Sequence, residues 1–449
     1  MARVGGGSVK GAMEEQIGPA SRWLQEARAL QTRLVEWRRH LHRIPELAFQ
    51  ERETSAYLAA QLQEMGLSPR RVGEAGGTGL LCDIAGADAG SGSGPTVLLR
   101  AEMDGLPVEE RTGLPFASVH PGLMHACGHD GHMAMLLGAA ALLTVHRREL
   151  PGRVRLLFQP AEEMRGGARE MIAAGVLAGV DVAFAQHLWP GLPVGTVAFK
   201  RGVAMAAMDR VHIRVIGRAG HGAAPHLATD AVVAQAHVVL ALQSLISRRV
   251  NPATPAVLTL GTVHGGKQEN VIAEEVDLTG TVRTVDPACR QSLPKMIEEA
   301  VASAAAGVGA RAETTWEWGY PPLVNDEQAL NALARAISGG RGMSGIEVRW
   351  LDTPAFASED FAFYLERVPG VFAFLGAGKD AAAVLHSPTF NVDEAVLPVG
   401  AATLVVAAFE LLVLARERRV GQTAGVGLPA SNIPLESACL GRRVGSEGR

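Results

Sequence analysis

The chain has 449 residues, with 42 basic (Lys, Arg) and 46 acidic (Asp, Glu) side chains, so its formal net charge is −4. A chain of this length exceeds one compact core, and two domains are expected. The mild acidity gives no electrostatic reason to bind nucleic acid or an anionic membrane, so we expect neither partner. Four widely spaced cysteines in so large a chain are typical of a cytoplasmic protein without disulfides. They are Cys82, Cys127, Cys289 and Cys439.

The sequence indicates neither a targeting segment nor a membrane span. The first twenty residues contain no apolar core of signal-peptide length, and Glu14 and Glu15 argue against a transit peptide. The most apolar helix-length run, Ala401–Ala415, is too short for a bilayer and contains Glu410, so it predicts a buried helix. The start of the chain contains the segment GGGS, and Gly, Ser and Arg are scattered from about Gly421 onward. We therefore expect residues 1–21 and 421–449 to be disordered tails.

In chain order, short β-rich runs alternate with longer helical patterns, which predicts an α/β layered fold. A first helix is expected over Ser21–Leu41, and a polar loop, Ala87–Pro95, separates two strands. Further strands are predicted at Thr96–Arg100, Arg153–Gln159, Val180–Gln186 and Val371–Leu375, and further helices at Asp130–Arg147 and Val396–Arg416.

In the middle of the chain, the strand and helix patterns follow a different order from those on either side, which predicts an inserted domain. Its elements come in the order strand, helix, strand, strand, helix, strand, which is the βαββαβ arrangement of a small ferredoxin-like sandwich. We assign residues 207–319 to this domain, and residues 22–206 and 320–420 to one discontinuous domain. The predicted elements are Asp209–Ile216, Asp230–Arg249, Ala256–Thr262, Val276–Val285, Arg290–Ala306 and Ala312–Trp318.

The densest group of chemically active side chains is the segment HACGHDGH, residues 125–132, just before a predicted helix. Cys127 and His129 are separated by one glycine, and thiolate and imidazole suit zinc and other borderline divalent ions. The alternative is a set of buried histidines with structural hydrogen bonds. Four such residues within eight positions favour a metal site.

A second group, Glu162 and Glu163 in the segment QPAEE, directly follows an apolar strand. Taken alone, proline followed by glutamates is better explained as a helix start, where the free N–H groups favour negative charge. The position gives weight to a functional interpretation, because α/β folds bind ligands at the carboxyl ends of strands. Three other ligand-type residues lie at comparable places: Asp104, His187 and His386.

These residues lie within motifs that resemble the M20 metallopeptidase family, in its amidohydrolase branch of hippurate hydrolases, auxin-conjugate hydrolases and N-acetyl-diaminopimelate deacetylases. The resemblance covers Trp37 to Leu412, about four-fifths of the chain. It depends on RRHLHRIPELAFQE, LLRAEMDGLP, GLPFAS, MHACGHDGHMAMLLGAA, LLFQPAEE, AGHGAAPH, ENVIAEEVDLTGTVRT, SEDFAFYLERVPG and LHSPTF, in this order.

The resemblance implies a mixed-sheet catalytic domain that binds two divalent ions, zinc, manganese, cobalt or nickel. It makes Glu162 the general base and Asp104 the residue that orients a ligand histidine. Asp130 and His132 are not implied as ligands. One departure is Glu102, where the family usually has aspartate; it is not expected to contact metal, so the departure concerns residues around the site. The implied ligands are Cys127, His129, Glu163, His187 and His386.

For the inserted domain, the resemblance implies a lid that also forms a homodimer. His221 matches a catalytic and substrate-binding histidine that can come from the partner subunit, and Asn270 and Arg283 match positions that hold the substrate's carboxylate. From the residues alone, Arg283 at the end of an alternating strand would be an ordinary edge charge.

Three functions remain open. The resemblance favours an enzyme that cleaves the amide of an N-acyl amino acid or a similar small conjugate. A dipeptidase or carboxypeptidase could use the same site, although no additional acidic anchor for a free amine is identified. A non-catalytic metal-binding homologue is the third, and the presence of Glu162 and all five ligand candidates argues against it. The sequence does not name the acyl group, the amino acid or the native metal.

Overall fold

The computed structural model describes residues 21–74, 77–87, 94–378 and 384–423. The described chain divides into two compact units. Unit 1 comprises the residues up to Gly202, then Asn325–Asp352, then Phe363 to the end of the last helix; unit 2 comprises Val203–Val324 and Thr353–Ala362. Segment Thr353–Ala362 lies within the stretch assigned from the sequence to the catalytic domain.

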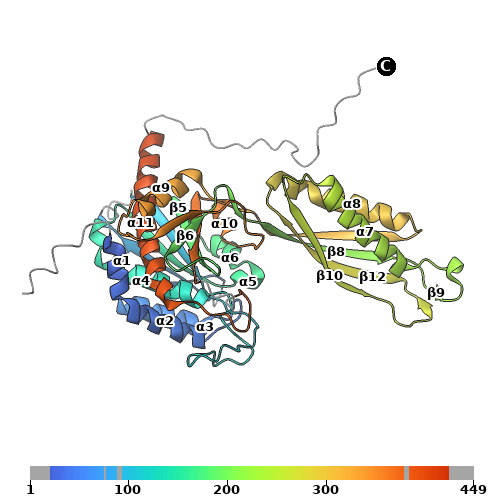
Figure 1. Cartoon of the computed structure of the whole chain (residues 1–449), viewed down its shortest axis with the longest axis horizontal. Coiled ribbons are helices and arrows are strands. Elements are labelled where there is room, and N and C mark those ends of the chain that lie inside the picture. The colour runs from blue at the N-terminus through green and yellow to red at the C-terminus, as the bar shows by residue number, and fades with distance from the viewer. Residues whose placement is uncertain (1–20, 75–76, 88–93, 379–383, 424–449) are drawn as a thin grey trace, which may run out of the picture. The chain divides into compact units, whose positions relative to one another are not determined.

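Unit 1 contains an eight-stranded mixed sheet between helices (Figure 1). Strands β3, β4 and β5 are parallel neighbours, β16 continues parallel to β5, and β2 and β6 run antiparallel to their neighbours β4 and β16. In spatial order the strands are β1 (Arg70–Val72), β2 (Gly79–Ala85), β4 (Arg153–Gln159), β3 (Thr96–Glu102), β5 (Val182–Trp189), β16 (Gly370–Gly376), β6 (Thr196–Phe199) and β15 (Glu347–Trp350).

The core of unit 1 is formed where two long apolar helices, α4 and α11, pack against β3 and β5. Both helices are apolar on nearly every side, as expected of helices buried within a layered fold. The other helices are α1 (Arg22–Ala29), α2 (Gln31–Arg43), α3 (Arg52–Glu64), α5 (Glu162–Arg165), α6 (Gly167–Ala173), α9 (Glu327–Ser338) and α10 (Ala362–Leu365), with short 3-10 turns at Arg147–Glu149 and Glu394–Val396. Helix α4 spans His129–Val145 and α11 spans Leu397–Thr423.

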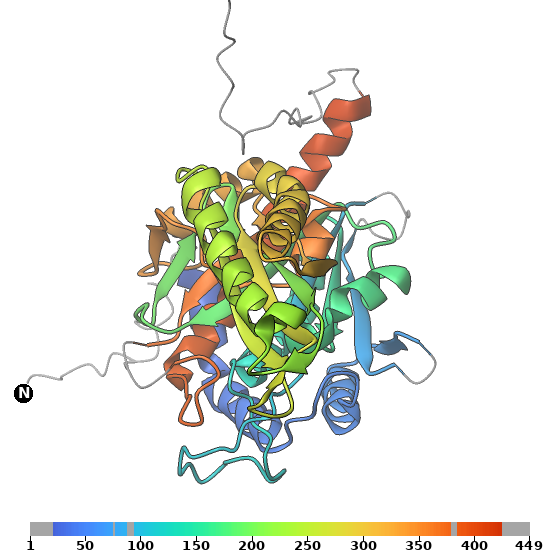
Figure 2. The same cartoon turned by 90° about the vertical axis from the view of Figure 1, so that its right-hand side faces the viewer.

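Unit 2 contains a four-stranded antiparallel sheet in the order β10, β12, β8, β13. Alternate residues of β8 are buried, and α7 and α8 lie side by side over that face (Figure 2). Both helices begin at an aspartate, Asp230 or Asp286, whose carboxylate accepts backbone N–H groups of the first turn. The elements are β8 (Ala207–Ile216), α7 (Ala231–Arg249), β10 (Ala256–Gly265), β12 (Glu275–Thr284), α8 (Pro287–Ala306) and β13 (Arg311–Tyr320).

Two small ribbons complete unit 2. One pairs β9 (Gly220–His221) with β11 (Val271–Ile272), next to a 3-10 turn at Pro225–Leu227, and the other pairs β7 (Val203–Met205) with β14 (Leu323–Val324). The fold class predicted from the sequence, including the inserted βαββαβ sandwich, is confirmed.

Two sequence expectations differ from the structure, and a third lies mostly outside the described residues. The single helix expected over Ser21–Leu41 is two helices, because the Leu30 N–H bonds to Ala27 three residues back in a tightened turn. Helix α11 continues through Gly421, where a tail was expected to begin. The rest of both expected tails, apart from Ser21 and the end of α11, lies outside the described residues.

Among the described residues, two helices are long and apolar enough to cross a membrane by length and composition alone. One is α11, whose apolar stretch is 83% buried inside the protein, as in the core helix of a layered fold. The other is α7, whose stretch is 28% buried and leaves Val232, Val233 and Leu240 exposed. Burial accounts for the hydrophobicity of α11 but only in part for that of α7.

Unit 2 depends on one buried ion pair, and its removal is a test of the fold. Arg290 donates two hydrogen bonds of 2.9 and 2.8 Å to Asp209, which also accepts the Gly319 N–H. Asp209→Ala leaves a buried guanidinium without its partner and is expected to destabilise unit 2 by about 3 kcal/mol. Calorimetric unfolding measures this effect. Arg214→Ala breaks the exposed Arg214–Glu275 pair and serves as the control; an equal shift of the melting temperature in both variants would contradict the prediction.

Candidate metal centre

The carboxyl ends of the parallel strands β3, β4 and β5 meet at one edge of the large sheet. Asp104 follows β3, Glu162 and Glu163 follow β4, and His187 lies two residues before the end of β5. Because neighbouring parallel strands present their ends together, residues more than eighty positions apart in sequence become neighbours. All of these side chains belong to unit 1.

A tight turn delivers Cys127 and His129 to this edge. Gly128 between them has φ +92°, and a Cβ there would lie 3.2 Å from a methyl group of Leu188. Glycine therefore meets both a backbone and a packing requirement at this position. Helix α4 begins at His129, so the histidine is anchored at the first turn of a buried helix.

Asp104 fixes two of the candidate ligands at once. His129 Nδ1–H donates to the backbone oxygen of Asp104 at 2.9 Å, and the Asp104 carboxylate accepts the backbone N–H of Glu163 at 3.0 Å. The carboxylate itself lies 3.4 Å from the same histidine nitrogen. With Nδ1 engaged as a donor, Nε2 is the nitrogen of His129 that remains for another partner.

The turn that carries Glu162 and Glu163 is held in an unusual backbone conformation. Ala161, directly before them, has φ +59°, which is uncommon for a residue with a Cβ. Its N–H donates to the buried carboxylate of Glu51 at 3.0 Å, and the Thr78 hydroxyl donates to the same carboxylate at 2.6 Å. Burial raises the pKa of Glu51 to about 7. Such strained turns occur at functional sites where neighbouring contacts hold them in place.

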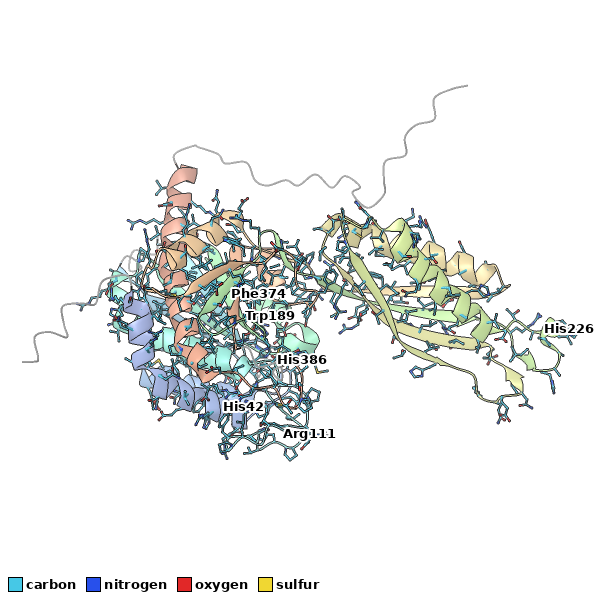
Figure 3. The ribbon with its side chains drawn as sticks, viewed as in Figure 1. His42, Arg111, Trp189, His226, Phe374 and His386 are labelled. Atoms are coloured by element: carbon cyan, nitrogen blue, oxygen red, sulfur yellow. The ribbon has the colours of Figure 1, made fainter. Side chains whose placement is uncertain are left out.

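His386 reaches the same place from the loop after β16 (Figure 3). Its φ is +65°, and its N–H donates to the backbone oxygen of Ala126 at 2.8 Å, which ties this loop to the turn that carries Cys127. Its side chain is 53% exposed, and Nε2 lies 3.3 Å from Oε1 of Glu163. His386 therefore forms the open side of the centre.

The donors match a pair of divalent ions in number and in type. Ligand atoms of Cys127, Glu163 and His386 lie within 4.8 Å of one another, as do those of His129, Glu162 and Glu163. His187 Nε2 lies 3.4 Å from Cys127 Sγ. Nε2 of His129 is buried without a hydrogen-bond partner among the described residues, which costs free energy unless an ion or water binds it. Thiolate, imidazole and carboxylate together suit borderline divalent ions.

The electrostatics of the centre suit cation binding. Burial alone favours a protonated Glu163, but His386 and His129 outweigh it and lower the pKa of Glu163 to about 2. Burial lowers the pKa of His187 to about 3, so its imidazole is neutral. The Trp189 ring packs edge-on against the Phe374 ring, with centroids 4.8 Å apart (Figure 3). The centroid of the His187 ring lies 6.1 Å from that of Trp189. Burial together with Glu163 and Glu162 raises the pKa of the Cys127 thiol well above its usual range.

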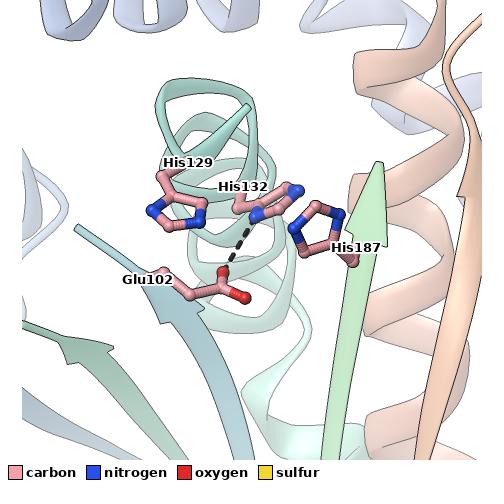
Figure 4. Close-up of side chains that lie close together, drawn as sticks. All are labelled: Glu102, His129, His132 and His187. Atoms are coloured by element: carbon pink, nitrogen blue, oxygen red, sulfur yellow. Dashed lines mark hydrogen bonds and ion pairs between the residues drawn. The ribbon is translucent and has the colours of Figure 1, made fainter. Parts of the chain in front are cut away.

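Several residues that hold the centre in place were not predicted from the sequence. Glu51 supports the turn at Ala161, and Arg100 contacts both Glu102 and Gln159. Glu51, Arg100 and Gln159 carry no recognisable ligand pattern, and His132 was not expected to bind metal. The structure places Glu102 and His132 beside His129 and His187, with candidate ligand atoms within 4.8 Å of one another (Figure 4). Two signals pointed to Glu102: its position at the end of a fully buried strand, and its departure from the aspartate that is usual in the family.

Asp130 lies outside the group of donors although it follows His129 directly. Its carboxylate accepts hydrogen bonds from Arg38 at 2.7 Å and from His42 at 2.9 Å. These contacts join α2 to the first turn of α4, so Asp130 anchors the helix that carries His129.

Of the three candidate residues of unit 2, His221 and Asn270 lie close together and Arg283 lies apart from them. His221 and Asn270 belong to the same small ribbon, where the Gly222 N–H donates to the Asn270 backbone oxygen at 2.8 Å. Arg283 lies near the other end of β12, eight residues from Glu275, which is about 27 Å along a strand at ~3.4 Å per residue. The ribbon that carries His221 follows β8 at Ile216, which pairs with Glu275, whereas Arg283 pairs with Met208 at the opposite end of the sheet. Arg283 and His221 of one subunit are therefore far apart.

Comparison with known proteins gives the class of this fold and site. The sequence pattern of peptidase family M20/M25/M40 matches residues 98–410. The chain is 43% identical over 365 residues to N-acetyl-L-cysteine deacetylase of Bacillus subtilis (strain 168), over 81% of this chain and 85% of the relative. It is 42% identical over 301 residues to N-acyl-L-amino acid amidohydrolase of Geobacillus stearothermophilus, over 67% of this chain and 80% of the relative.

Among solved structures, the Bacillus subtilis YXEP protein, described as a dinuclear metal binding peptidase from the M20 family, has the same fold. Its TM-score is 0.75 at 36% identity, over 86% of this chain and 99% of that chain. The chain belongs to peptidase family M20. The resemblance seen in the sequence motifs is confirmed.

Metal binding at this centre is expected to release protons. The Cys127 thiol is neutral in the metal-free protein because its pKa is raised, and a thiol that ligates metal must lose its proton. Affinity for Zn²⁺ should therefore increase as pH rises, by about tenfold per pH unit for each proton released. Calorimetric titration in two buffers of different ionisation enthalpy counts the protons. Cys289 is a buried thiol of unit 2, and Cys289→Ser should leave the proton count unchanged. If Cys127→Ser also leaves the count unchanged, the prediction is wrong.

Proposed function

We propose that this chain is a metal-dependent amidohydrolase that cleaves the amide bond of an N-acyl amino acid or a related small conjugate. The observation that supports it best is the convergence of five ligand-type side chains with Glu162 at one strand edge, in a chain of family M20. The relatives named for N-acetyl-L-cysteine deacetylation and N-acyl-L-amino acid hydrolysis support this substrate class.

In this proposal, Cys127, His129, Glu163, His187 and His386 hold two divalent ions. Zinc, manganese, cobalt and nickel all suit a donor set of one thiolate, three imidazoles and one carboxylate. When bound, the ions supply a water of lowered pKa and polarise the substrate's carbonyl group. Asp104 keeps His129 and Glu163 oriented through the two hydrogen bonds described above.

Glu162 is proposed as the general base. The residue is 7% exposed, and a carboxylate oxygen lies within 4.8 Å of ligand atoms of His129 and Glu163. It accepts a proton from the attacking water and then donates that proton to the departing amine nitrogen. Glu163 cannot share this role while it is a ligand, so two adjacent carboxylates have different tasks because their surroundings differ.

The substrate's carboxylate is proposed to bind Arg283 and Asn270, with His221 next to the reacting carbonyl group. A guanidinium can hold a carboxylate through two parallel hydrogen bonds. Arg283 is half-buried and donates to Thr281 Oγ1 at 3.0 Å, so its stem is already oriented. Because Arg283 and His221 lie toward opposite ends of the sheet of unit 2, the proposal takes them from two subunits if they act on one substrate.

We further propose that two copies associate through unit 2. Strand β10 is an edge of the four-stranded sheet and lacks the lysine or proline that often protects an exposed edge. The exposed apolar residues Val232, Val233 and Leu240 lie on α7 in the same unit. A two-fold pairing of β10 with its copy would cover this edge. Because α7 packs against β10, the same association would bring α7 close to the partner subunit.

We place the protein in the cytoplasm, where the thiols of Cys82, Cys127 and Cys289 stay reduced. A reducing compartment keeps Cys127 available as a ligand.

The substrate class is tested with acetyl, benzoyl, indoleacetyl and succinyl amino acids and with free dipeptides, each with a single metal restored to stripped protein. Hydrolysis of acyl amino acids is expected, with Glu162→Gln lowering kcat by at least ~10²-fold while metal content is kept. Preferential cleavage of dipeptides would favour the peptidase alternative. No hydrolysis of any substrate by metal-loaded protein would favour a non-catalytic homologue. Loss of metal in Glu162→Gln would make Glu162 a ligand.

The shared-site proposal is tested by mixing two inactive variants. Glu162→Gln and His221→Ala should exchange subunits and form heterodimers in which one site is intact, so partial activity returns. Native mass spectrometry confirms the exchange. If heterodimers form and activity does not return, His221 acts within its own chain or not at all.

A further inference from the structure

His132 has both ring nitrogens engaged by neighbouring groups. Its Nε2 accepts the backbone N–H of Leu188 at 2.9 Å, so the ring hydrogen is on Nδ1. Nδ1–H then donates to Oε2 of Glu102 at 2.8 Å (Figure 4). Although His132 lies in the same group of donors as His129 and His187, it has no lone pair left for a metal ion.

Glu102 is held in place from its other side. Oε1 of Glu102 forms an ion pair with the buried guanidinium of Arg100, which also donates to Gln159 at 2.9 Å. The Tyr364 hydroxyl donates to the same oxygen of Gln159, also at 2.9 Å. Each of these side chains is almost fully buried. The carboxylate of Glu102 is therefore fixed and its charge is compensated, so it serves as a rigid acceptor for His132.

Leu188 joins His132 to the candidate ligand His187. Its N–H is held by His132, and its backbone oxygen accepts Nδ1–H of His187 at 2.8 Å. With Nδ1 engaged in this way, Nε2 of His187 faces Cys127 and lies 3.4 Å from its Sγ. The orientation of the His187 ring thus depends on the Leu188 backbone, and the position of that backbone depends on His132.

We propose that Glu102 and His132 form a positioning pair that acts through the Leu188 backbone to orient His187 for metal binding. In this role neither residue is a ligand, because both ring nitrogens of His132 and both carboxylate oxygens of Glu102 are engaged by neighbouring groups. The inference rests on the proposed function only in taking His187 as a ligand. It also gives a role to Glu102, which stands where the family usually has aspartate: the longer side chain reaches the imidazole of α4 from the end of β3.

The test measures metal affinity, not activity. His132→Leu removes both hydrogen bonds, and of the two Co²⁺ binding events one should weaken by about 10- to 100-fold while the other is unchanged. The absorption bands of bound Co²⁺ should shift, because they report the geometry of the ligands. His132→Gln keeps an acceptor for the Leu188 N–H and should recover most of the affinity. Glu102→Asp shortens the reach and should weaken the same binding event less than His132→Leu does.

Gln186→Leu is the matched control. Gln186 is next to His187 on β5 and equally buried, but its amide donates to the Gly400 backbone oxygen at 2.9 Å, away from this chain of contacts. It should lower the melting temperature and leave both affinities and the Co²⁺ spectrum unchanged. Equal weakening in Gln186→Leu and His132→Leu would overturn the proposal, as would unchanged Co²⁺ binding in His132→Leu and Glu102→Asp.

The outcomes separate this inference from the proposed function. If the wild-type protein hydrolyses acyl amino acids and His132 and Glu102 variants bind Co²⁺ normally, only the positioning role fails. If Co²⁺ binding changes as expected but no acyl amino acid is cleaved, the positioning role stands and the substrate class fails. If the wild-type protein binds no divalent ion, both fail.

Discussion

Burial of ionisable side chains at the strand edge is the constraint that organises unit 1. Cys127, His129 and Glu163 are nearly inaccessible to water, and burial disfavours the charged form of each. Neighbouring charges reverse this effect for two of them, raising the pKa of His129 to about 10 and lowering that of Glu163 to about 2. A cluster of this kind is stable when its members are paired with one another or with a cation. Burial of these ionisable side chains costs free energy, and a bound cation would offset that cost, which favours metal binding at this cluster.

Most of the donors are oriented by a backbone contact. Asp104 holds His129 through its backbone oxygen and Glu163 through its carboxylate, and Leu188 holds His187. His386 is tied to the turn that carries Cys127. Because backbone groups move less than side chains, these contacts limit the entropy lost when a ligand is bound. The centre is thus organised before any ion arrives.

Unit 2 depends on a different kind of order. Its sheet and helices are joined by an apolar core and by the buried Arg290–Asp209 pair, while β10 and one face of α7 remain uncovered. The separation of Arg283 from His221 and Asn270 makes a second subunit necessary for the substrate contacts that we propose. In this proposal a complete substrate site forms only when two subunits associate.

The sequence by itself determined the local structure and the residue chemistry. The alternation of β8 and β12 and the apolar runs of α4 and α11 predicted their elements, because hydrophobic periodicity follows directly from strand and helix geometry. Residue chemistry marked Cys127 and His129 as metal candidates, because thiolate and imidazole have known metal preferences, and the resemblance to family M20 implied the full ligand set. Most element ends were off by three residues or fewer, but α11 continues to Thr423, seven residues past the predicted end at Arg416.

Only the tertiary structure decided which atoms of those residues are available. HACGHDGH contains three histidines of the same chemistry, yet His132 is consumed by Glu102 and Leu188 while Nε2 of His129 is left free. That difference arises from contacts thirty and fifty-six positions away, which local sequence does not encode. The distance between Arg283 and His221 is likewise a property of how β12 and the β9–β11 ribbon are connected in space. The sequence specifies which donors exist, and the packing of distant strands specifies which of them can bind.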